Sequence, residues 1–220
     1  MNMDFTTQVL AFFFIFMSIV LHEISHGYAA YLLGDDTAKR MGRLSLNPLH
    51  HVDIFGTIIL PIILFMTAGF AFGYAKPVPI NPYNFKNYKK GMGITGAAGP
   101  LANFIITFIL AIVYVILAKS GLGENVRAFN VLKLTMQVNI FLALFNLIPV
   151  PPLDGSRIVG AFLSDEAYIK YSKLERYGMY IILGALVLGS FLNISIIGLI
   201  INRPFQFVWG FFAQFINALL

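Results

Sequence analysis

Residues 9–33, VLAFFFIFMSIVLHEISHGYAAYLL, decide the fold of this chain. The stretch is long enough to cross a bilayer, which takes about 20 apolar residues in a helix. The only side chains in it that titrate near neutral pH are His22, Glu23 and His26. Ionisable groups inside a bilayer are costly and are usually functional. The stretch therefore predicts a transmembrane helix that carries a functional site.

These three residues form an H-E-x-x-H motif between His22 and His26. On a helix, positions i and i+4 lie on one face about 5–6 Å apart, so both imidazoles can bind one Zn²⁺. In metallopeptidases with this spacing the glutamate accepts a proton from the attacking water. The motif also occurs by chance in helices that bind no metal. The apolar surroundings favour the zinc interpretation here, because a metal would compensate the buried polar groups.

The composition is typical of a multi-spanning membrane protein. Of the 220 residues, 58% are hydrophobic and 11% are charged, which lies far outside the range of soluble domains. The net charge of +5 does not indicate a nucleic-acid partner, because the basic residues gather in short loops beside apolar segments. The absence of cysteine excludes thiolate ligands, disulfides and a cysteine nucleophile.

We expect an all-α polytopic membrane protein with about five to six transmembrane segments. The long apolar stretches predict helices at residues ~6–33, ~93–118, ~128–148 and ~176–201, with a shorter segment at ~205–220. We expect one membrane-embedded domain over residues 1–220. Its catalytic core would span about 6–160, and about 176–220 would add further helices.

The apolar run 54–72 is ambiguous. It has nearly the length of a span, but it contains Gly56, Pro61 and Gly69, and both flanking loops are basic. If both loops are cytoplasmic, the run must enter and leave the membrane on one side. The third long helix then brings its C-terminal end to the depth of the H-E-x-x-H motif. This topology predicts an active site within the bilayer, toward the cytoplasmic side of the cell membrane.

Two histidines leave a catalytic zinc one protein ligand short, because such sites usually hold three protein ligands and a water. A candidate is Asp154, at the end of the segment NLIPVPPLDG (146–155). The prolines of this segment end the preceding helix, and Gly155 allows a tight turn after the carboxylate. Taken alone, the segment predicts a turn at a membrane surface. Beside a motif that lacks a ligand, it predicts the third ligand.

Three signatures occur in order along the chain: H-E-x-x-H at 22–26, G-x-x-x-N at 99–103, and N-x-x-P-x-x-x-L-D-G at 146–155. Together they resemble the site-2 protease family of intramembrane zinc metalloproteases, in particular its small prokaryotic members without PDZ or CBS domains. The signatures cover the chain from residue 22 to residue 155. No motif covers the stretch after about residue 175.

The resemblance implies that one Zn²⁺ per chain is bound by His22, His26 and Asp154, and that Glu23 is the general base. It implies that Asn146 lies near the zinc, where its amide would stabilise the oxyanion or hold the substrate. Asn103 would have a similar role, although the small residues around it also suit helix packing. The resemblance further implies transmembrane protein substrates and a membrane-associated re-entrant or β-hairpin element between the first two catalytic helices.

A metal or ion transporter is the alternative function, because transporters also place ligands on broken helices near the bilayer midplane. Glu23 discriminates between the two, since an ion pathway needs ligands but no general base. A catalytically silent scaffold is disfavoured by the presence of all three ligands and the base. The sequence does not indicate which proteins are cleaved or how many copies of the chain assemble.

Overall fold

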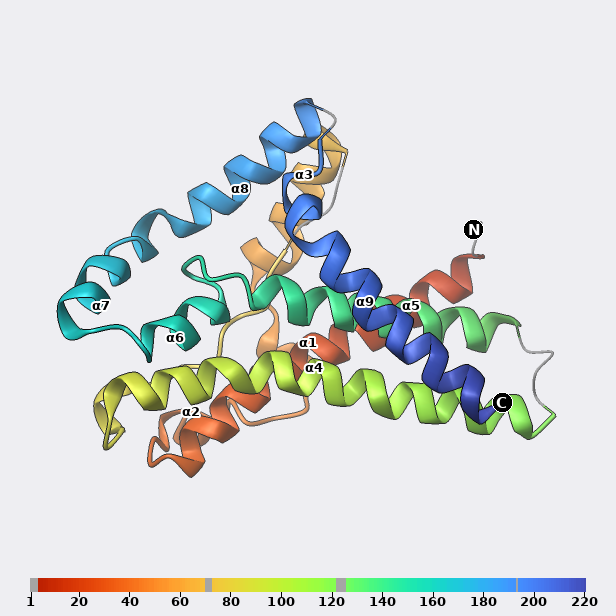
Figure 1. Ribbon diagram of the computed structural model, residues 1–220, viewed down its shortest axis with the longest axis horizontal. Coiled ribbons are helices and arrows are strands. Elements are labelled where there is room, and N and C mark those ends of the chain that lie inside the picture. Colours follow the sequence, from red (N-terminus) through yellow and green to blue (C-terminus); the bar gives the residue numbers. More distant parts are fainter. Residues whose placement is uncertain (1–3, 70–72, 122–125, 193) are drawn as a thin grey trace.

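The computed structural model describes residues 4–69, 73–121, 126–192 and 194–220, and within these ranges all regular secondary structure is helical. Three long helices lie side by side and form the centre of the molecule (Figure 1). They are α1 (Phe5–Leu32), α4 (Tyr88–Lys119) and α5 (Val126–Asn146). Their bounds agree with the first three predicted helices to within about one turn.

Local sequence explains where these helices begin and end. Asp4 caps α1 by accepting a hydrogen bond from the Thr7 amide at 2.7 Å. Asn87 caps α4 in the same way, and this cap extends the helix upstream of the predicted start near residue 93. Helix α5 ends at Asn146, shortly before Pro149, since proline lacks the N–H that a helix interior requires.

The helices are suited to a bilayer. Among the described residues, four helices are long and apolar enough to cross one: α1, α4, α5 and α9 (Ile196–Leu219). A fifth span results if α7 (Asp165–Ser172) and α8 (Glu175–Phe191), which meet at a bend of 53°, are counted as one. In the four long helices only 17–39% of the apolar window is buried inside the protein, so most of these side chains face outward. The chain is therefore an all-α, multi-pass membrane protein, as predicted.

The C-terminal part differs from the prediction. A single helix was expected at ~176–201 and a short one at ~205–220, but α8 ends at Phe191 and α9 runs from Ile196. Ser195 caps α9 by accepting a hydrogen bond from the Gly198 amide at 3.0 Å. Helix α9 then continues through Pro204. The predicted boundary was wrong because apolarity alone does not reveal a cap within an apolar run.

The region between α1 and α4 also differs. It contains α2 (Thr37–Arg40), a π-helical turn at Ile54–Ile59 and α3 (Leu60–Ala68). The expected β-hairpin is not present in the described residues, because 54–68 is helical and 73–81 forms no ladder. An apolar segment satisfies its own backbone hydrogen bonds best as a helix, and this outweighed the glycine and the proline. Residues 70–72 of the run lie outside the described residues, and re-entry into the membrane stays a prediction.

Two apolar clusters hold α8 and α9 to the bundle. The first joins α9 to α4 and α5, and its buried members are Ala111, Val115, Met136, Ile140, Phe212 and Ile216. The second joins α8 and α9 to the end of α5 and the loop after it, through Phe145, Leu153, Ile182 and Ile201. Short helix α6 (Asp154–Gly160) packs on α4. These contacts fix the loop between α5 and α6 beside α1.

Candidate metal centre

Two elements that lie far apart in sequence bring three metal-binding side chains together. His22 and His26 come from α1, and Asp154 is the first residue of α6. The two imidazole Nε2 atoms are 3.1 Å apart, and each is 3.2 Å from Asp154 Oδ2. All three residues are buried, with 4–6% of their surface exposed. The sequence predicted this group, and the fold places it at one point.

Hydrogen bonds behind the two imidazoles determine where their protons lie. His26 Nδ1 is 2.7 Å from the Thr95 carbonyl oxygen, which can only accept, so Nδ1 must donate. His22 Nδ1 is 2.9 Å from Asn103 Oδ1, which accepts in the same way. In each neutral ring the lone pair is then on Nε2 and points to the shared centre.

Three acceptor atoms therefore meet at the centre with no hydrogen-bond donor between them. Asp154 Oδ2 is buried and receives no hydrogen bond from the described residues, and it faces two nitrogen lone pairs. A single added proton would satisfy only one of the two imidazoles. One divalent cation would satisfy all three atoms at once.

The spacing of the three atoms fits zinc. Protein ligands about 2.0–2.2 Å from a tetrahedral ion lie about 3.3–3.5 Å from one another. The observed separations of 3.1–3.2 Å are close to this value and need only a small adjustment. Three protein ligands leave one position open, which is the arrangement of a catalytic rather than a structural site.

Gly99 forms the wall of this centre on α4. A Cβ atom at position 99 would lie 2.6 Å from His22 Nε2 and would also overlap His26 Nε2. Thr95, Gly99 and Asn103 follow one another at intervals of four residues, so they share one face of α4. This face presents a carbonyl, a space and an amide to the two histidines of α1. The i, i+4, i+8 spacing is the sequence signal that would have identified Thr95 as part of the site.

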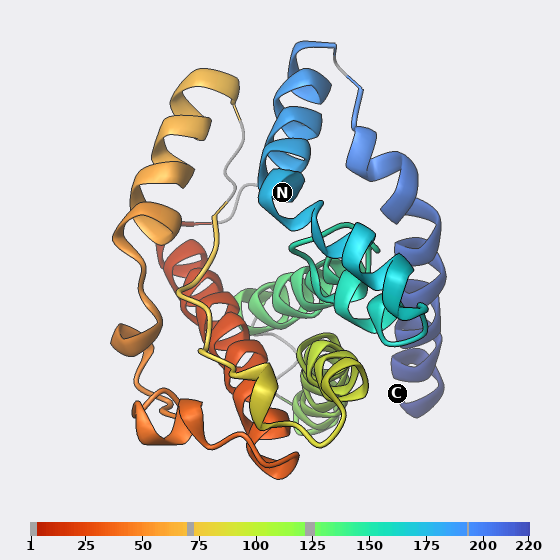
Figure 2. The ribbon, with the colours of Figure 1, turned by 90° about the vertical axis from the view of Figure 1, so that its left-hand side faces the viewer.

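The segment 73–81 runs beside α1 (Figure 2), and Glu23 of α1 contacts it. Its Oε2 accepts a hydrogen bond from the Val78 amide at 3.0 Å. The amides of Tyr74, Lys76 and Val78 all point to this side of the segment. Their acceptors are, in order, the Gly56 carbonyl at 3.0 Å, the His51 carbonyl at 2.9 Å and Glu23 Oε2. The segment is thus tied to α1 at Val78 and to residues 51–56 at Tyr74 and Lys76, and this alternation of bonded amides is that of extended backbone.

The opposite side of the segment has a different character. In extended backbone, alternate residues direct their N–H and C=O groups to opposite sides. Ala75, Pro77 and Pro79 therefore face away from Glu23, and both prolines lack an N–H. This side offers carbonyl oxygens and few donors.

The two asparagines take different positions. Asn103 is fully buried and contacts the metal centre through His22. Asn146 lies at the end of α5, where its Nδ2 donates to the Leu142 carbonyl at 3.0 Å in its own helix. Nearby, Arg157 Nη1 lies 3.9 Å from Asp154 Oδ1, which makes a long ion pair with the side of the carboxylate that faces away from the imidazoles.

Asp35, just after α1, anchors the far end of segment 73–81. Its carboxylate is fully buried and accepts hydrogen bonds from the Asn81 amide at 2.7 Å and from Asn84 Nδ2 at 2.7 Å. Thr37 donates both its hydroxyl and its amide to the same carboxylate. Burial raises the pKa of Asp35, but these hydrogen bonds outweigh it and hold the pKa below its ordinary value.

Asp35→Asn is expected to lower the free energy of unfolding at pH 7 by about 1–3 kcal/mol, because the new NH₂ group can only donate and leaves at least one buried donor without an acceptor. Since the folded-state pKa is lowered, the stability from Asp35 is complete above the unfolded pKa of about 3.9 and is lost as pH falls below it. The difference in thermal midpoint between parent and variant should therefore shrink from pH 7 to pH 3. Asp36→Asn, at a half-exposed neighbour, is the control. An equal effect of both variants would contradict the role of Asp35.

Comparisons with known proteins agree with this geometry. The family model "Peptidase family M50" matches residues 122–189. YwhC of Bacillus subtilis, which carries the name of a zinc metalloprotease, is 38% identical over 182 residues and 80% of each chain. Zinc metalloprotease MJ0392 of Methanocaldococcus jannaschii is 32% identical over 164 residues, which are 74% of this chain and 37% of that protein.

No solved structure matches the chain significantly. None of the names found supports the alternative of a metal or ion transporter. The zinc metalloproteases found by sequence and the buried His-His-Asp group both support Zn²⁺ as the cofactor. The chain belongs to peptidase family M50, the site-2 protease family, and is a zinc metalloprotease.

Proposed function

We propose that the protein is an intramembrane endopeptidase that cleaves transmembrane segments of other proteins. The single observation that carries this proposal is the convergence of three buried lone pairs between helices long and apolar enough to span a bilayer. In this proposal His22, His26 and Asp154 hold the zinc. Zinc at this position would supply a Lewis acid that polarises the scissile carbonyl and makes nearby water more acidic.

Glu23 is the proposed general base. It accepts a proton from the water that attacks the peptide carbon, and it passes this proton to the leaving amine as the C–N bond breaks. A carboxylate has two oxygens, so Oε2 can keep its hydrogen bond to Val78 while the other oxygen handles the proton. Glu23 thereby couples the position of segment 73–81 to the proton transfer.

The two asparagines have separate proposed roles. Asn103 fixes the ring of His22 in the tautomer that leaves Nε2 free. For Asn146, the resemblance to the family supports contact with the oxyanion or the substrate. Its amide would leave the Leu142 carbonyl to do so, which is possible at a helix end because that carbonyl can bind water.

A transmembrane substrate must unwind locally, because a helix keeps its carbonyls in internal hydrogen bonds. The unwound strand needs new partners, and the carbonyls of Pro77 and Pro79 can accept its N–H groups. This edge cannot bind the carbonyls of the substrate at the two prolines. Carbonyls of the substrate would then stay free to be polarised at the metal centre.

The position of the site relative to the membrane follows from charge. Basic residues gather in the loops after α1 and before α4, on the side where α1 ends. His22 and His26 lie in the C-terminal half of α1, toward these loops. By the positive-inside rule this side is cytoplasmic. We therefore place the active site toward the cytoplasmic face of the cell membrane, in a single domain that includes residues 1–220.

Purified protein incubated with a panel of single-span substrates should test this function. We expect cleavage inside the hydrophobic segment, its loss with a zinc chelator, and its return with added Zn²⁺. Mass spectrometry of the products locates the cut. Cleavage that resists the chelator would overturn the assignment of the site. Cuts found only in water-exposed tails would overturn the intramembrane part alone.

A further inference from the structure

The loop that delivers Asp154 has little support of its own. Residues 147–153 include three prolines, which have no N–H and cannot form regular backbone hydrogen bonds. Within the loop, the Val150 amide donates to the Ile148 carbonyl and the Leu153 amide donates to the Val150 carbonyl. Such a segment needs external contacts to hold a metal ligand in place, since a shift of about 1 Å matters at a catalytic site.

Helices α7 and α8 supply these contacts at three alternate positions of the loop. Tyr171 donates its hydroxyl to the Pro149 carbonyl at 2.6 Å. Ile182 packs with Leu153, which is only 9% exposed. Between these two contacts, Gly178 of α8 lies directly against the Pro151–Pro152 peptide.

At Gly178 the backbone of α8 comes so close to the backbone of the loop that no side chain fits between them. A Cβ atom at this position would overlap the Pro151 carbonyl and would lie 2.9 Å from Pro152 N. The obstacle is backbone, so it cannot rotate away as a side chain would. Gly178 and Ile182 are four residues apart and therefore lie on the same face of α8. One helix face thus contacts the loop at two successive points.

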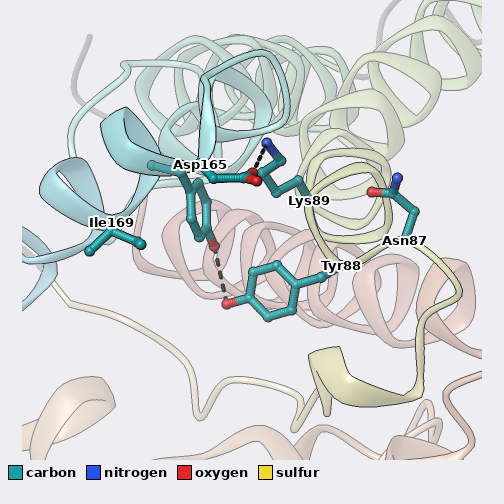
Figure 3. A pocket seen from close by; sticks show the side chains of 6 residues that line it. Asn87, Tyr88, Lys89, Asp165 and Ile169 are labelled. Atoms are coloured by element: carbon teal, nitrogen blue, oxygen red, sulfur yellow. Dashed lines mark hydrogen bonds and ion pairs between the residues drawn. The ribbon is translucent and has the colours of Figure 1, made fainter.

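Helix α7 is in turn fixed to the start of α4 (Figure 3). Lys89 forms an ion pair with Asp165 at 2.6 Å and also donates to the Leu163 carbonyl at 2.9 Å. Tyr168 donates its hydroxyl to the Tyr88 hydroxyl at 3.1 Å. These contacts border a shallow pocket of about 390 Å³ and connect α7 to the helix that also carries Gly99. Helix α7, which contacts the loop, is therefore anchored on the same helix that forms the wall of the metal centre.

On this basis we infer that α7 and α8 form a brace that positions Asp154 as a zinc ligand, with Gly178 and Tyr171 as positioning residues. The inference rests on the proposed role of Asp154. It assigns a function to the stretch after residue 175, which carries no motif. Helix α8 leans away from the bundle of α1, α4 and α5 (Figure 1), and its buried contacts on this side reach this loop and the end of α5.

Gly178→Ala tests the brace, and Gly184→Ala is its matched control. Both changes add one methyl group to α8 and raise helix propensity equally, but a Cβ at Gly184 meets nothing within 4 Å. We expect Gly178→Ala to weaken zinc binding about 10-fold or more, as is typical when the support of a ligand is disturbed. Gly184→Ala should bind zinc as the parent does. Competition with a chromophoric chelator measures this affinity independently of cleavage.

Tyr171→Phe gives a second measurement that adds no volume. It removes only the hydrogen bond to Pro149, and we expect weaker zinc binding with unchanged thermal unfolding of the zinc-free protein. If Gly178→Ala fails to fold, this variant decides the question. Parent-like zinc affinity in Tyr171→Phe, or in folded Gly178→Ala, would overturn the brace. Asp154→Ala separates the two proposals, because parent-like affinity in that variant would overturn the ligand assignment itself.

Discussion

Glu23→Gln should reduce the rate of substrate cleavage about 10²–10⁴-fold while leaving zinc binding unchanged. Glutamine has nearly the same shape as glutamate, and its side-chain carbonyl can still accept the hydrogen bond from Val78. Segment 73–81 should therefore stay in place. What the variant loses is a group that can take a proton from water. A transporter would show no such selective loss, since ion passage requires no base.

The experiment compares zinc content and the initial rate of cleavage of one single-span substrate. Glu166→Gln, at an exposed position of α7, is the control and should behave as the parent does. Should Glu23→Gln retain the parental rate, another group must be the base. If it loses zinc along with activity, Glu23 supports the metal centre rather than the proton transfer.

Gly99→Ala should have the largest effect on zinc binding. The added methyl group would lie among the Nε2 atoms of His22 and His26, where the metal must be. Both imidazoles are fixed from behind by Asn103 and the Thr95 carbonyl, so they cannot retreat without breaking buried hydrogen bonds. We expect a loss of affinity beyond the about 10–100-fold that follows from changes behind the ligands.

Metal analysis of the purified variant, followed by chelator competition, measures this loss. Gly210→Ala in α9 is the control, because a Cβ there meets nothing within 4 Å. Full zinc occupancy in Gly99→Ala, with parental affinity, would show that the metal lies elsewhere. Retained helicity in the variant would separate a local steric effect from general unfolding.

Much of the site could be predicted because its chemistry is encoded in short spacings. The i, i+4 histidines identify one face of α1 without any tertiary information. Asp154 could be predicted because a zinc with two ligands requires a third, and because the prolines before it indicated a broken helix. The long helices were predictable for the same reason that they enter a bilayer, namely continuous apolar length.

Other parts depend on contacts that no local pattern contains. The Val78 amide is a backbone group, so the identity of residue 78 says little about its contact with Glu23. Residues 54–68 are helical although glycine and proline suggested a bend, since an apolar segment satisfies its own backbone best as a helix. The start of α9 at Ile196 depends on a cap at Ser195, and apolarity does not reveal it.

The two prolines of segment 73–81 also limit how copies of this protein can meet. Reciprocal antiparallel pairing needs a donor and an acceptor on each strand, and an open edge with both is prone to join its twin. Pro77 and Pro79 have no N–H to donate, so this segment cannot form reciprocal backbone hydrogen bonds with the same segment of a second copy at these positions. The same loss means that these two positions have no amide hydrogen that needs an acceptor. Self-association is thereby disfavoured, whereas a strand of another protein that has its own N–H groups can still donate to the carbonyls of this segment.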